Sequence, residues 1–411
     1  MKFGLLGANL GHSFSREIHN RLGDYTYEFF ERREDEIEEL FKNPDIAGFN
    51  VTVPYKQSVI KYCDEVDEDA LSIGAVNTVV KNEGRSVGYN TDIDGFLFQV
   101  ETSGISVEGK KVLILGEGGT SNTVHRAMEK LGAGEILKFS RRGQLKFKDL
   151  ENHFDGEIIV NCTPVGTYPK NMESLVDLRD FSDLEGVLDV VYNPLRTKMI
   201  LQAEELGIKN NSGLGMLVVQ AKIASEYFQR TSIPHGEVFK ILREIERESE
   251  NVVLIGMPGS GKSALGQKIA EALKRPFIDI DEEIERAVGK SIPEIFKEDG
   301  EGFFRERETE ITEKFGKNRG MVISTGGGTI LKEKNRQALK QNGRIYLIRR
   351  PLEELSTKGR PLSEGGLMKL QKLYEERRPL YEKFCDYSVD NEFFGKTVQD
   401  IIGEFYENHR H

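Results

Sequence analysis

A glycine-rich run near the middle of the chain strongly limits what the second half can fold into. The run is Gly256-Met257-Pro258-Gly259-Ser260-Gly261-Lys262-Ser263. It follows the apolar stretch 252–255 and precedes Leu265, Ile269 and Leu273, which recur on one face of a predicted helix. A G-x-x-x-x-G-K-[ST] loop between a strand and a helix is typical of proteins that bind nucleotide phosphates. We therefore expect a nucleoside triphosphate here, and the alternative is a glycine-rich turn without a ligand.

The residues of this loop have separable expected roles. Pro258, Gly259, Ser260 and Gly261 form a cradle in which backbone N–H groups converge on phosphate oxygens, and the following helix N-terminus adds positive potential. Lys262 reaches the outer phosphates, and the Ser263 hydroxyl can ligate Mg²⁺. ATP and Mg²⁺ are the cofactors that this half of the chain is expected to bind.

The length and composition of the chain exclude several classes of protein. The loop begins about 250 residues into a chain of 411 residues, so one or two further domains precede it. The chain is 38% hydrophobic and 30% charged, and no apolar stretch approaches the ~20 residues of a bilayer-spanning helix. A net charge of −11 argues against nucleic acid as a general partner. Neither a membrane nor a nucleic acid is expected as a partner.

The ends and the cysteines of the chain predict its compartment. Residues 1–7 form too short an apolar run for a secretory signal and are better explained as a first buried strand. Cys63, Cys162 and Cys385 are far apart, which fits neither a metal cluster nor a disulfide framework and suits a reducing compartment. We expect a cytoplasmic protein.

The first half alternates short apolar runs with helical patterns, which is the signature of an α/β fold. The candidate strands are 3–6, 48–53, 76–80, 111–115, 135–139, 158–160 and 187–191. A charged amphipathic helix is predicted over 237–250, almost directly before the strand that leads into the phosphate loop.

A second glycine-rich segment follows the candidate strand 111–115. It is Gly116-Glu117-Gly118-Gly119-Thr120, and Ser121 stands where a dinucleotide fingerprint usually has a third Gly or Ala. About twenty residues later, the next strand ends in Ser140-Arg141-Arg142, where an NAD site would place Asp or Glu. Two arginines there suit a 2′-phosphate, so NADP is favoured over NAD; the alternative is a solvated basic turn.

Further polar motifs occur in a fixed order along the first half. They are Gly7–Ser15 with its two hydroxyls, 50–56, 74–78, 89–95, 161–166 and 213–220. From their residues alone, Ser13 and Ser15 could hold a small anion or cap the following helix. Together the motifs resemble shikimate dehydrogenase over roughly residues 1 to 245.

This resemblance implies roles for individual residues. Lys56 matches the catalytic lysine and Asp92 its partner carboxylate, a pair that can exchange a proton with the carbonyl oxygen as hydride moves; a surface salt bridge is the alternative. The positions that hold the substrate's carboxylate and hydroxyls are Ser13, Ser15, Thr52, Asn77, Asp92, Tyr192 and Gln220. The NADP positions are Gly116, Glu117, Gly118, Gly119, Thr120, Ser140, Arg141 and Arg142, with Gly213 near the nicotinamide.

The second half has its own series of motifs around the phosphate loop. They are 277–281, in which a strand is predicted to end in alternate aspartates, 302–308, the glycines 326–328, 359–362 and 376–381. Because strand side chains alternate, Asp279 and Asp281 are predicted to point to one side. The series resembles shikimate kinase across residues 251 to 411.

By this resemblance, Asp279 lies near Mg²⁺ through water, and Asp281 holds the attacking hydroxyl and accepts its proton. Arg305 and Arg377 clamp the substrate carboxylate, a task that suits the bidentate guanidinium. The catalytic, substrate-binding and ATP-binding positions also include Lys262, Gly327, which allows the substrate to approach the backbone, and Arg360, a lid residue that neutralises charge on the transferring phosphoryl group.

These patterns predict an α/β protein made of a two-lobed dehydrogenase with a Rossmann-like NADP lobe, followed by a phosphate-loop kinase domain with a parallel sheet. The predicted domains are 1–248, with a substrate lobe of 1–100 plus 225–248 and an NADP lobe of 101–224, and 249–411. The expected activities are NADPH-dependent reduction of 3-dehydroshikimate and ATP-dependent phosphorylation of shikimate. Two alternatives stay open at this point: a preference for quinate, and a kinase half that senses nucleotide with little turnover. The oligomeric state is also open.

Overall fold

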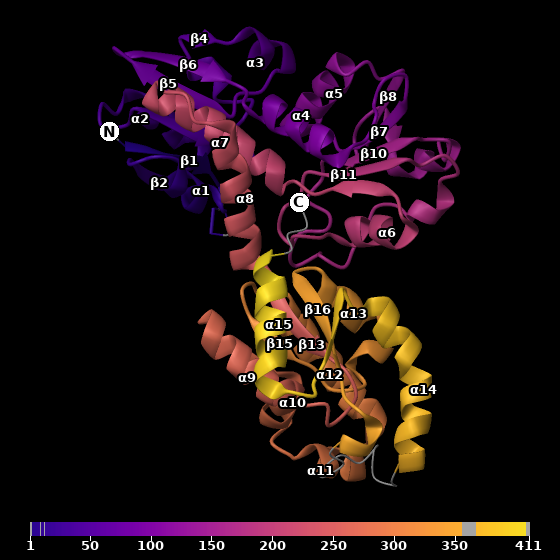
Figure 1. Cartoon of the computed structure of the whole chain (residues 1–411). Helices are drawn as coiled ribbons and strands as arrows, with labels where there is room; N and C mark the ends of the chain where they lie inside the picture. The colour runs from indigo at the N-terminus through magenta and orange to yellow at the C-terminus, as the bar shows by residue number, and fades with distance from the viewer. Residues whose placement is uncertain (1, 9, 12, 356–366, 408–411) are drawn as a thin grey trace. The chain divides into compact units, whose positions relative to one another are not determined.

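The computed structural model describes residues 2–8, 10–11, 13–355 and 367–407, and Figure 1 shows their course. The chain divides into two compact units. The first comprises Met1–Asn193 and Gln202–Leu242, and the second comprises Pro194–Leu201 and Arg243–His411. The domain limits at residues 248 and 249 stay predictions. Among the described residues, no helix combines the length and the apolar character that a bilayer span requires.

The first sheet of the N-terminal unit is mixed, with the strand order β2-β1-β3-β5-β6-β4. Only β5 runs antiparallel to its neighbours β3 and β6. Leu5 and Leu6 of β1 face opposite sides, because strand side chains alternate. Leu5 packs with Phe228 of α7, whereas Leu6 packs with Phe49 in a second cluster. The strands are β1 (Lys2–Gly7), β2 (Thr26–Glu31), β3 (Gly48–Val51), β4 (Glu65–Val66), β5 (Thr78–Asn82) and β6 (Arg85–Tyr89).

The second sheet of this unit is parallel throughout, with the order β12-β11-β10-β7-β8-β9. Its strands are β7 (Lys111–Leu115), β8 (Glu135–Ser140), β9 (Leu145–Lys146), β10 (Ile158–Asn161), β11 (Gly186–Asp189) and β12 (Lys209–Asn211). The order reverses between β7 and β10, so the carboxyl ends of these two strands flank a topological switch point. Open parallel sheets bind ligands at such points.

Helices cover both sheets of the N-terminal unit. Val112 and Ile114 of β7 share a core with Phe96 of α4 and Val124 of α5. Helix α7 also packs against α4 and α1. The helices whose residues lie in this unit wholly or in part are α1 (Ser15–Leu22), α2 (Ile37–Lys42), α3 (Glu68–Ile73), α4 (Asp92–Ser103), α5 (Gly119–Lys130), α6 (Lys198–Leu206), α7 (Leu214–Gln229) and α8 (His235–Ser249).

The C-terminal unit contains one parallel sheet of order β14-β15-β13-β16-β17. Its strands are β13 (Asn251–Ile255), β14 (Phe277–Asp279), β15 (Val322–Ser324), β16 (Gly343–Arg349) and β17 (Tyr387–Asp390). Figure 1 shows α9 and α15 on one side of this sheet and α12, α13 and α14 on the other. Leu254 packs toward α9 and α15, and Val253 packs toward the opposite group. The helices are α9 (Lys262–Leu273), α10 (Ile280–Val288), α11 (Ile292–Glu298), α12 (Gly300–Gly316), α13 (Glu333–Lys340), α14 (Leu367–Phe384) and α15 (Phe394–Glu407).

The predicted α/β class is confirmed, and several predicted strands shift at their ends. The prediction 111–115 coincides with β7, whereas 48–53 stops at Val51, 76–80 becomes β5 at Thr78–Asn82, and 187–191 becomes β11 at Gly186–Asp189. The residues past Asp189 leave the ladder because the Asp189 side chain accepts a hydrogen bond from the Val191 backbone, which turns the chain. Strands β2 and β6 were not among the predicted strands.

Candidate active sites

Lys56 and Asp92 meet in the first unit. The Lys56 ammonium donates to Asp92 Oδ2 at 2.5 Å, and the two side chains are only 14% and 8% exposed. Asp92 is the first residue of α4, where the helix N-terminus favours a negative charge. The pair is therefore more enclosed than a surface salt bridge.

Asn77 joins this pair to the helix on the other side of the site. Its amide nitrogen donates to Asp92 Oδ1 at 2.8 Å and to Gln220 Oε1 at 3.4 Å. Its amide oxygen accepts from the Thr91 backbone at 2.8 Å. Gln220 lies near the middle of α7, so one hydrogen-bonded network links the starts of β5 and α4 to α7. Both Asp92 oxygens are occupied, which fixes the carboxylate and thereby the Lys56 ammonium.

Ser13 and Ser15 lie together at the start of α1. The Ser13 hydroxyl donates to Ser15 Oγ at 3.0 Å and accepts from the Ser15 backbone at 3.2 Å. Phe14 occupies the helix cap position, and no side chain caps this helix. The Ser13 hydroxyl nevertheless accepts the N–H of Ser15, the first residue of the helix, so both alternatives for these hydroxyls stay open. Tyr192, at the end of the second sheet, lies with its ring 5.3 Å from that of Phe14, which brings it to the same loop.

Thr52 follows β3 beside the first strand. Its backbone N–H donates to the Leu6 carbonyl at 2.9 Å, and its methyl group lies close to Gly7. Thr52 thus lies at the same end of the sheet as the serine pair, whereas within the described residues no hydrogen bond joins it to Lys56, Asn77 or the serines.

The glycine-rich loop after β7 lies next to Lys56. A Cβ at Gly119 would stand 3.7 Å from Cβ of Lys56. Gly116 has φ of +130°, which an L side chain rarely adopts, and Gly118 caps α5. Gly213 precedes α7, and a Cβ there would lie 2.1 Å from the Val190 carbonyl oxygen. The loop therefore lets a phosphate-bearing ligand approach the helix N-terminus within reach of the Lys56–Asp92 pair.

The basic turn after β8 faces the same loop. Arg141 and Arg142 are exposed, and the Ser140 hydroxyl donates to Glu117 Oε2 at 2.5 Å. Thr120 lies in the first turn of α5. The donor set suits a dinucleotide phosphate, because it combines free backbone N–H groups of a glycine loop with two guanidinium groups.

In the second unit, Lys262 and Ser263 begin α9 directly after the phosphate loop. The Lys262 ammonium donates to the carbonyl oxygens of Gly256 and Met257 at 3.0 and 2.9 Å. The Ser263 hydroxyl donates to Asp279 Oδ2 at 2.6 Å. A hydroxyl and a carboxylate side by side suit Mg²⁺, which is usually held by few protein ligands and several waters.

The predicted placement of Asp279 and Asp281 on one strand is wrong. Strand β14 ends at Asp279, which caps α10, and Asp279 Oδ1 accepts from the Asp281 backbone at 3.0 Å. Capping ends the strand, so Asp281 sits in the first helical turn. Burial, together with the negative charges of Asp279 and Glu308, raises the pKa of Asp281 to about 7. A carboxyl group of this kind can exchange a proton with a hydroxyl near neutral pH.

The glycines after β15 bring several of the predicted residues together. A Cβ at Gly326 would lie 2.6 Å from Asp281 Oδ1, and one at Gly328 would lie 2.5 Å from the Arg305 guanidinium. At Gly327 it would meet Pro258 of the phosphate loop at 2.6 Å. Only residues without a side chain fit between these groups.

Arg305 and Arg377 are both largely buried. Arg305 donates to Glu308 at 2.8 Å and to Glu301 at 3.2 Å. Arg377 lies on α14 beside Tyr381, whose hydroxyl donates to the Gly327 carbonyl at 2.5 Å. Arg360 lies outside the described residues.

Sequence reasoning gave no role to Glu308, Tyr381 and Asn391. Glu308 is fully buried and accepts from Arg305 and from the Thr329 hydroxyl at 2.8 Å. Its spacing of three residues from Arg305 on one helix was a usable signal. Asn391 donates to the Ser260 carbonyl at 2.8 Å from a distant strand end, and no local pattern indicates that contact.

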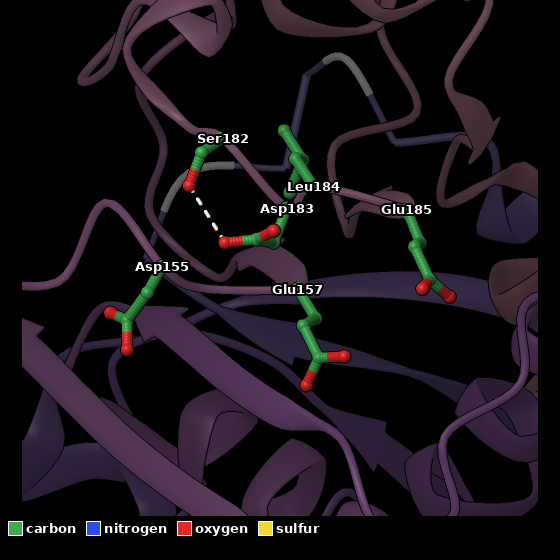
Figure 2. Close-up of a pocket in the computed structure, with 6 residues that line it drawn as sticks. All are labelled: Asp155, Glu157, Ser182, Asp183, Leu184 and Glu185. Atoms are coloured by element: carbon green, nitrogen blue, oxygen red, sulfur yellow. Dashed lines mark hydrogen bonds between the residues drawn. The ribbon is translucent and has the colours of Figure 1, made fainter.

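A separate acidic pocket of about 480 Å³ lies in the first unit and is shown in Figure 2. Asp155, Glu157 and Glu185 are among the residues that line it. It lies at the amino ends of β10 and β11, whereas the glycine-rich loop lies at the carboxyl end of β7 in the same parallel sheet. Lys110 pairs with Glu157 and Glu185, and Lys111 pairs with Asp155. These ion pairs are sufficient to explain the acidic side chains, so this pocket is not a candidate active site.

Models of two protein families match the chain. Residues 5–79 match the shikimate dehydrogenase substrate binding domain. Residues 258–407 match shikimate kinase. The first match includes Ser13, Ser15, Thr52, Lys56 and Asn77 but ends before Asp92. The second match includes all the candidate residues of the kinase half.

Characterised relatives extend the similarity over the NADP lobe. The shikimate dehydrogenase (NADP(+)) of Clostridium perfringens strain SM101 is 35% identical over 265 residues, which is 59% of this chain and 98% of that protein. A chorismate mutase/shikimate 5-dehydrogenase fusion protein from Clostridium acetobutylicum is 32% identical, with a TM-score of 0.57 over 60% of this chain and 97% of that one. Shikimate 5-dehydrogenase from Listeria monocytogenes, solved with shikimate and NAD, is 29% identical, with a TM-score of 0.52 over 59% and 96%.

Proposed function

The chain belongs to the shikimate dehydrogenase family through its N-terminal part and carries a shikimate kinase domain at residues 258–407, and we propose that it catalyses two consecutive reactions. The first is the NADPH-dependent reduction of 3-dehydroshikimate to shikimate. The second is the ATP-dependent phosphorylation of shikimate to shikimate 3-phosphate. The product of the first reaction is the substrate of the second. NADP, ATP and Mg²⁺ are the cofactors of these activities, and we place the reactions in the cytoplasm.

In the dehydrogenase site, Lys56 gives a proton to the carbonyl oxygen while NADPH supplies the hydride. Asp92 keeps the Lys56 ammonium in place, because it accepts from Lys56 at 2.5 Å and is itself fixed by Asn77. The substrate hydroxyls bind to Asn77, Asp92 and Gln220. The substrate carboxylate binds to the polar residues Ser13, Ser15, Thr52 and Tyr192.

The nicotinamide nucleotide lies along the loop after β7. Gly118, Gly119 and Thr120 at the N-terminus of α5 would hold its phosphates. Gly213, whose backbone packs closely against Val190, would lie near the nicotinamide end, and Arg141 and Arg142 would hold the adenosine end. A nucleotide held by this loop would lie close to the catalytic pair, since a Cβ at Gly119 would lie 3.7 Å from Cβ of Lys56.

In the kinase site, ATP supplies the phosphoryl group, and its phosphates lie on the loop 256–263. Asp281 orients the attacking hydroxyl and accepts its proton. Arg305 and Arg377 hold the carboxylate of shikimate, and Arg360 offsets the charge on the transferring group. Lys262, which donates to the loop carbonyls, would donate to the outer phosphates when ATP is bound, and Ser263 and Asp279 would hold Mg²⁺.

The observation that carries the proposal is that two unrelated sites in one chain match families acting on the same ring acid. The side chains of the kinase site favour turnover over nucleotide sensing, because Asp281 and Arg305 converge on the glycines 326–328. A sensor would need neither an acceptor-binding arginine nor a base.

A coupled assay tests the function. The full chain is given 3-dehydroshikimate, NADPH, ATP and Mg²⁺, and both NADPH oxidation and the phosphorylated product are followed. We expect shikimate to accumulate without ATP and shikimate 3-phosphate to form with it. Parallel assays replace shikimate with quinate. Preferential turnover of quinate, or ATP binding without a phosphorylated product, would contradict the proposal.

A further inference from the structure

A carboxylate stands at the place where the adenosine end of the dinucleotide is proposed to bind. Glu117 follows the first glycine after β7, and Ser140 is the last residue of the adjacent strand β8. The Ser140 hydroxyl donates to Glu117 Oε2 at 2.5 Å. A Cβ at Gly143 would lie 3.0 Å from the same oxygen. Glu117 thus reaches across the sheet edge into the basic turn.

The hydrogen bonds of Ser140 leave it little to offer a phosphate. A hydroxyl has one proton to donate, and that of Ser140 goes to Glu117. Its oxygen already accepts from the backbone N–H groups of Arg142 at 3.3 Å and Gly143 at 2.6 Å. For Ser140 to donate to a 2′-phosphate, its bond to Glu117 must break, which would leave a carboxylate facing a phosphate.

The charges of this turn oppose one another. Arg141 and Arg142 attract a 2′-phosphate, whereas Glu117 repels it. Among the described residues, Glu117 accepts from the Ser140 hydroxyl and forms no ion pair with either arginine. In NAD-binding sheets of this type, an acidic residue at the end of the next strand accepts from the ribose hydroxyls. Glu117 comes from the glycine-rich loop instead, but its carboxylate reaches Ser140 at the end of β8 and is therefore suited to the same task.

We propose that Glu117 sets the nucleotide preference of the dehydrogenase: it accepts a hydrogen bond from the adenine ribose of NAD and opposes the 2′-phosphate of NADP. Arg141 and Arg142 favour the binding of NADP, and Glu117 reduces the difference in affinity between NADP and NAD. This inference rests on the proposed function, because it presumes that the loop after β7 holds the dinucleotide.

The test compares Glu117→Gln, which keeps the shape and removes the charge, with the parent chain. NADPH and NADH are titrated separately without substrate, and binding is followed by the fluorescence of the reduced nicotinamide. We expect NADPH to bind more tightly and NADH more weakly, so that the ratio of the two dissociation constants moves by about tenfold toward NADPH. The ratio of kcat/KM for the two nucleotides should move in the same direction.

Two control variants separate charge from shape. Glu108→Gln makes the same charge change at an exposed residue before β7, at the opposite end of the strand, and should leave the ratio unchanged. Ser140→Ala removes the hydroxyl but keeps the carboxylate, and should not tighten NADPH binding. An unchanged ratio in Glu117→Gln, an equal shift in Glu108→Gln, or tighter NADPH binding in Ser140→Ala would each overturn the inference. If the parent chain bound neither nucleotide, the proposed dehydrogenase function would fall with it.

Discussion

At the scale of single residues, the kinase site contains a buried ion pair between Glu308 and Arg305, the arginine expected to bind the substrate carboxylate. Glu308 has a side chain that is 1% exposed and lies against Arg305. A buried carboxylate is tolerated only when it is paired and hydrogen-bonded, and Glu308 accepts from both Arg305 and Thr329. The pair therefore fixes the direction of the Arg305 guanidinium before the substrate arrives.

Replacing Glu308 with Gln should weaken substrate binding more than nucleotide binding. The amide keeps the shape but no longer opposes the charge of Arg305, so the guanidinium loses its fixed direction. We expect the KM for shikimate to rise about tenfold, and the free energy of unfolding of the kinase unit to fall by about 1–3 kcal/mol. Steady-state kinetics with varied shikimate and varied ATP, together with urea unfolding, measure both effects.

Glu301 provides the matched control, because it pairs with the same arginine from an exposed position. Exposed ion pairs contribute little, so Glu301→Gln should change neither quantity measurably. An equal rise in KM for shikimate and for ATP in Glu308→Gln would indicate a general loss of structure and would contradict the positioning role.

At the scale of elements, the junction between β11 and α7 has no room for a side chain at Gly213. A Cβ there would lie 2.1 Å from the Val190 carbonyl oxygen. This clash is with backbone, so it cannot be relieved by a change of side-chain rotamer. Gly213→Ala should lower the free energy of unfolding of the first unit by about 1–3 kcal/mol and weaken NADPH binding. Urea unfolding and nucleotide titration test this expectation. Gly236→Ala, where a Cβ meets nothing within 4 Å, is the control and should not be destabilising.

Helix α1 carries a buried histidine that makes the stability of the first unit depend on pH. His19 is fully buried, stacks on Tyr27 at 4.0 Å and shares a 2.6 Å hydrogen bond with Tyr25. Burial lowers the pKa of His19 to about 3, so the folded state keeps it neutral. Below the unfolded pKa of about 6.5, the unfolded state binds a proton that the folded state does not. Stability is therefore lost as the pH falls from about 6.5 toward 3.

The contribution of His19 can be measured by urea unfolding at several pH values. Between pH 6.5 and 5, it should cost the first unit about 2 kcal/mol, since each pH unit corresponds to about 1.4 kcal/mol. His19→Asn should show a shallower fall with pH, whatever its stability at neutral pH. His235→Asn, at an exposed position, should follow the parent chain. Equal slopes for the parent chain and His19→Asn would rule out this origin.

Elements with strong local signals were predictable from the sequence, and elements that depend on tertiary contacts were not. For the loop 256–263 and for strand β7, the apolar run, the glycines and the helical pattern that follows all predict the same strand–loop–helix structure. The end of β14 depends on whether Asp279 caps a helix, which strand periodicity does not reveal. Likewise, Asn391 supports the phosphate loop through the Ser260 carbonyl from a distant strand end, whereas Glu308 lies only one helical turn from Arg305. The residues expected to touch substrate or cofactor could be predicted from sequence motifs, whereas the residues that position them depend on packing, which the motifs do not encode.

At the scale of the whole molecule, the two proposed sites have no catalytic residue in common. Lys56 and Asp92 lie in the first unit, and Asp281 and Arg305 lie in the second. Each site has its own sheet, its own glycine-rich loop and its own anion-binding helix N-terminus. We therefore expect the chemical step of each reaction to survive loss of the other.

Reciprocal substitutions test this independence. Lys56→Ala should lower the dehydrogenase rate by 10²- to 10⁴-fold, because the proton donor is lost, while leaving phosphorylation of added shikimate unchanged. Asp281→Asn should lower the kinase rate by a similar factor and leave NADPH oxidation unchanged. The two half-reactions are measured separately, and Lys61→Ala, an exposed lysine of the same segment, serves as the control for Lys56. If either substitution stopped both reactions in a folded protein, the two units would have to share a step, because no side chain assigned to one site takes part in the other.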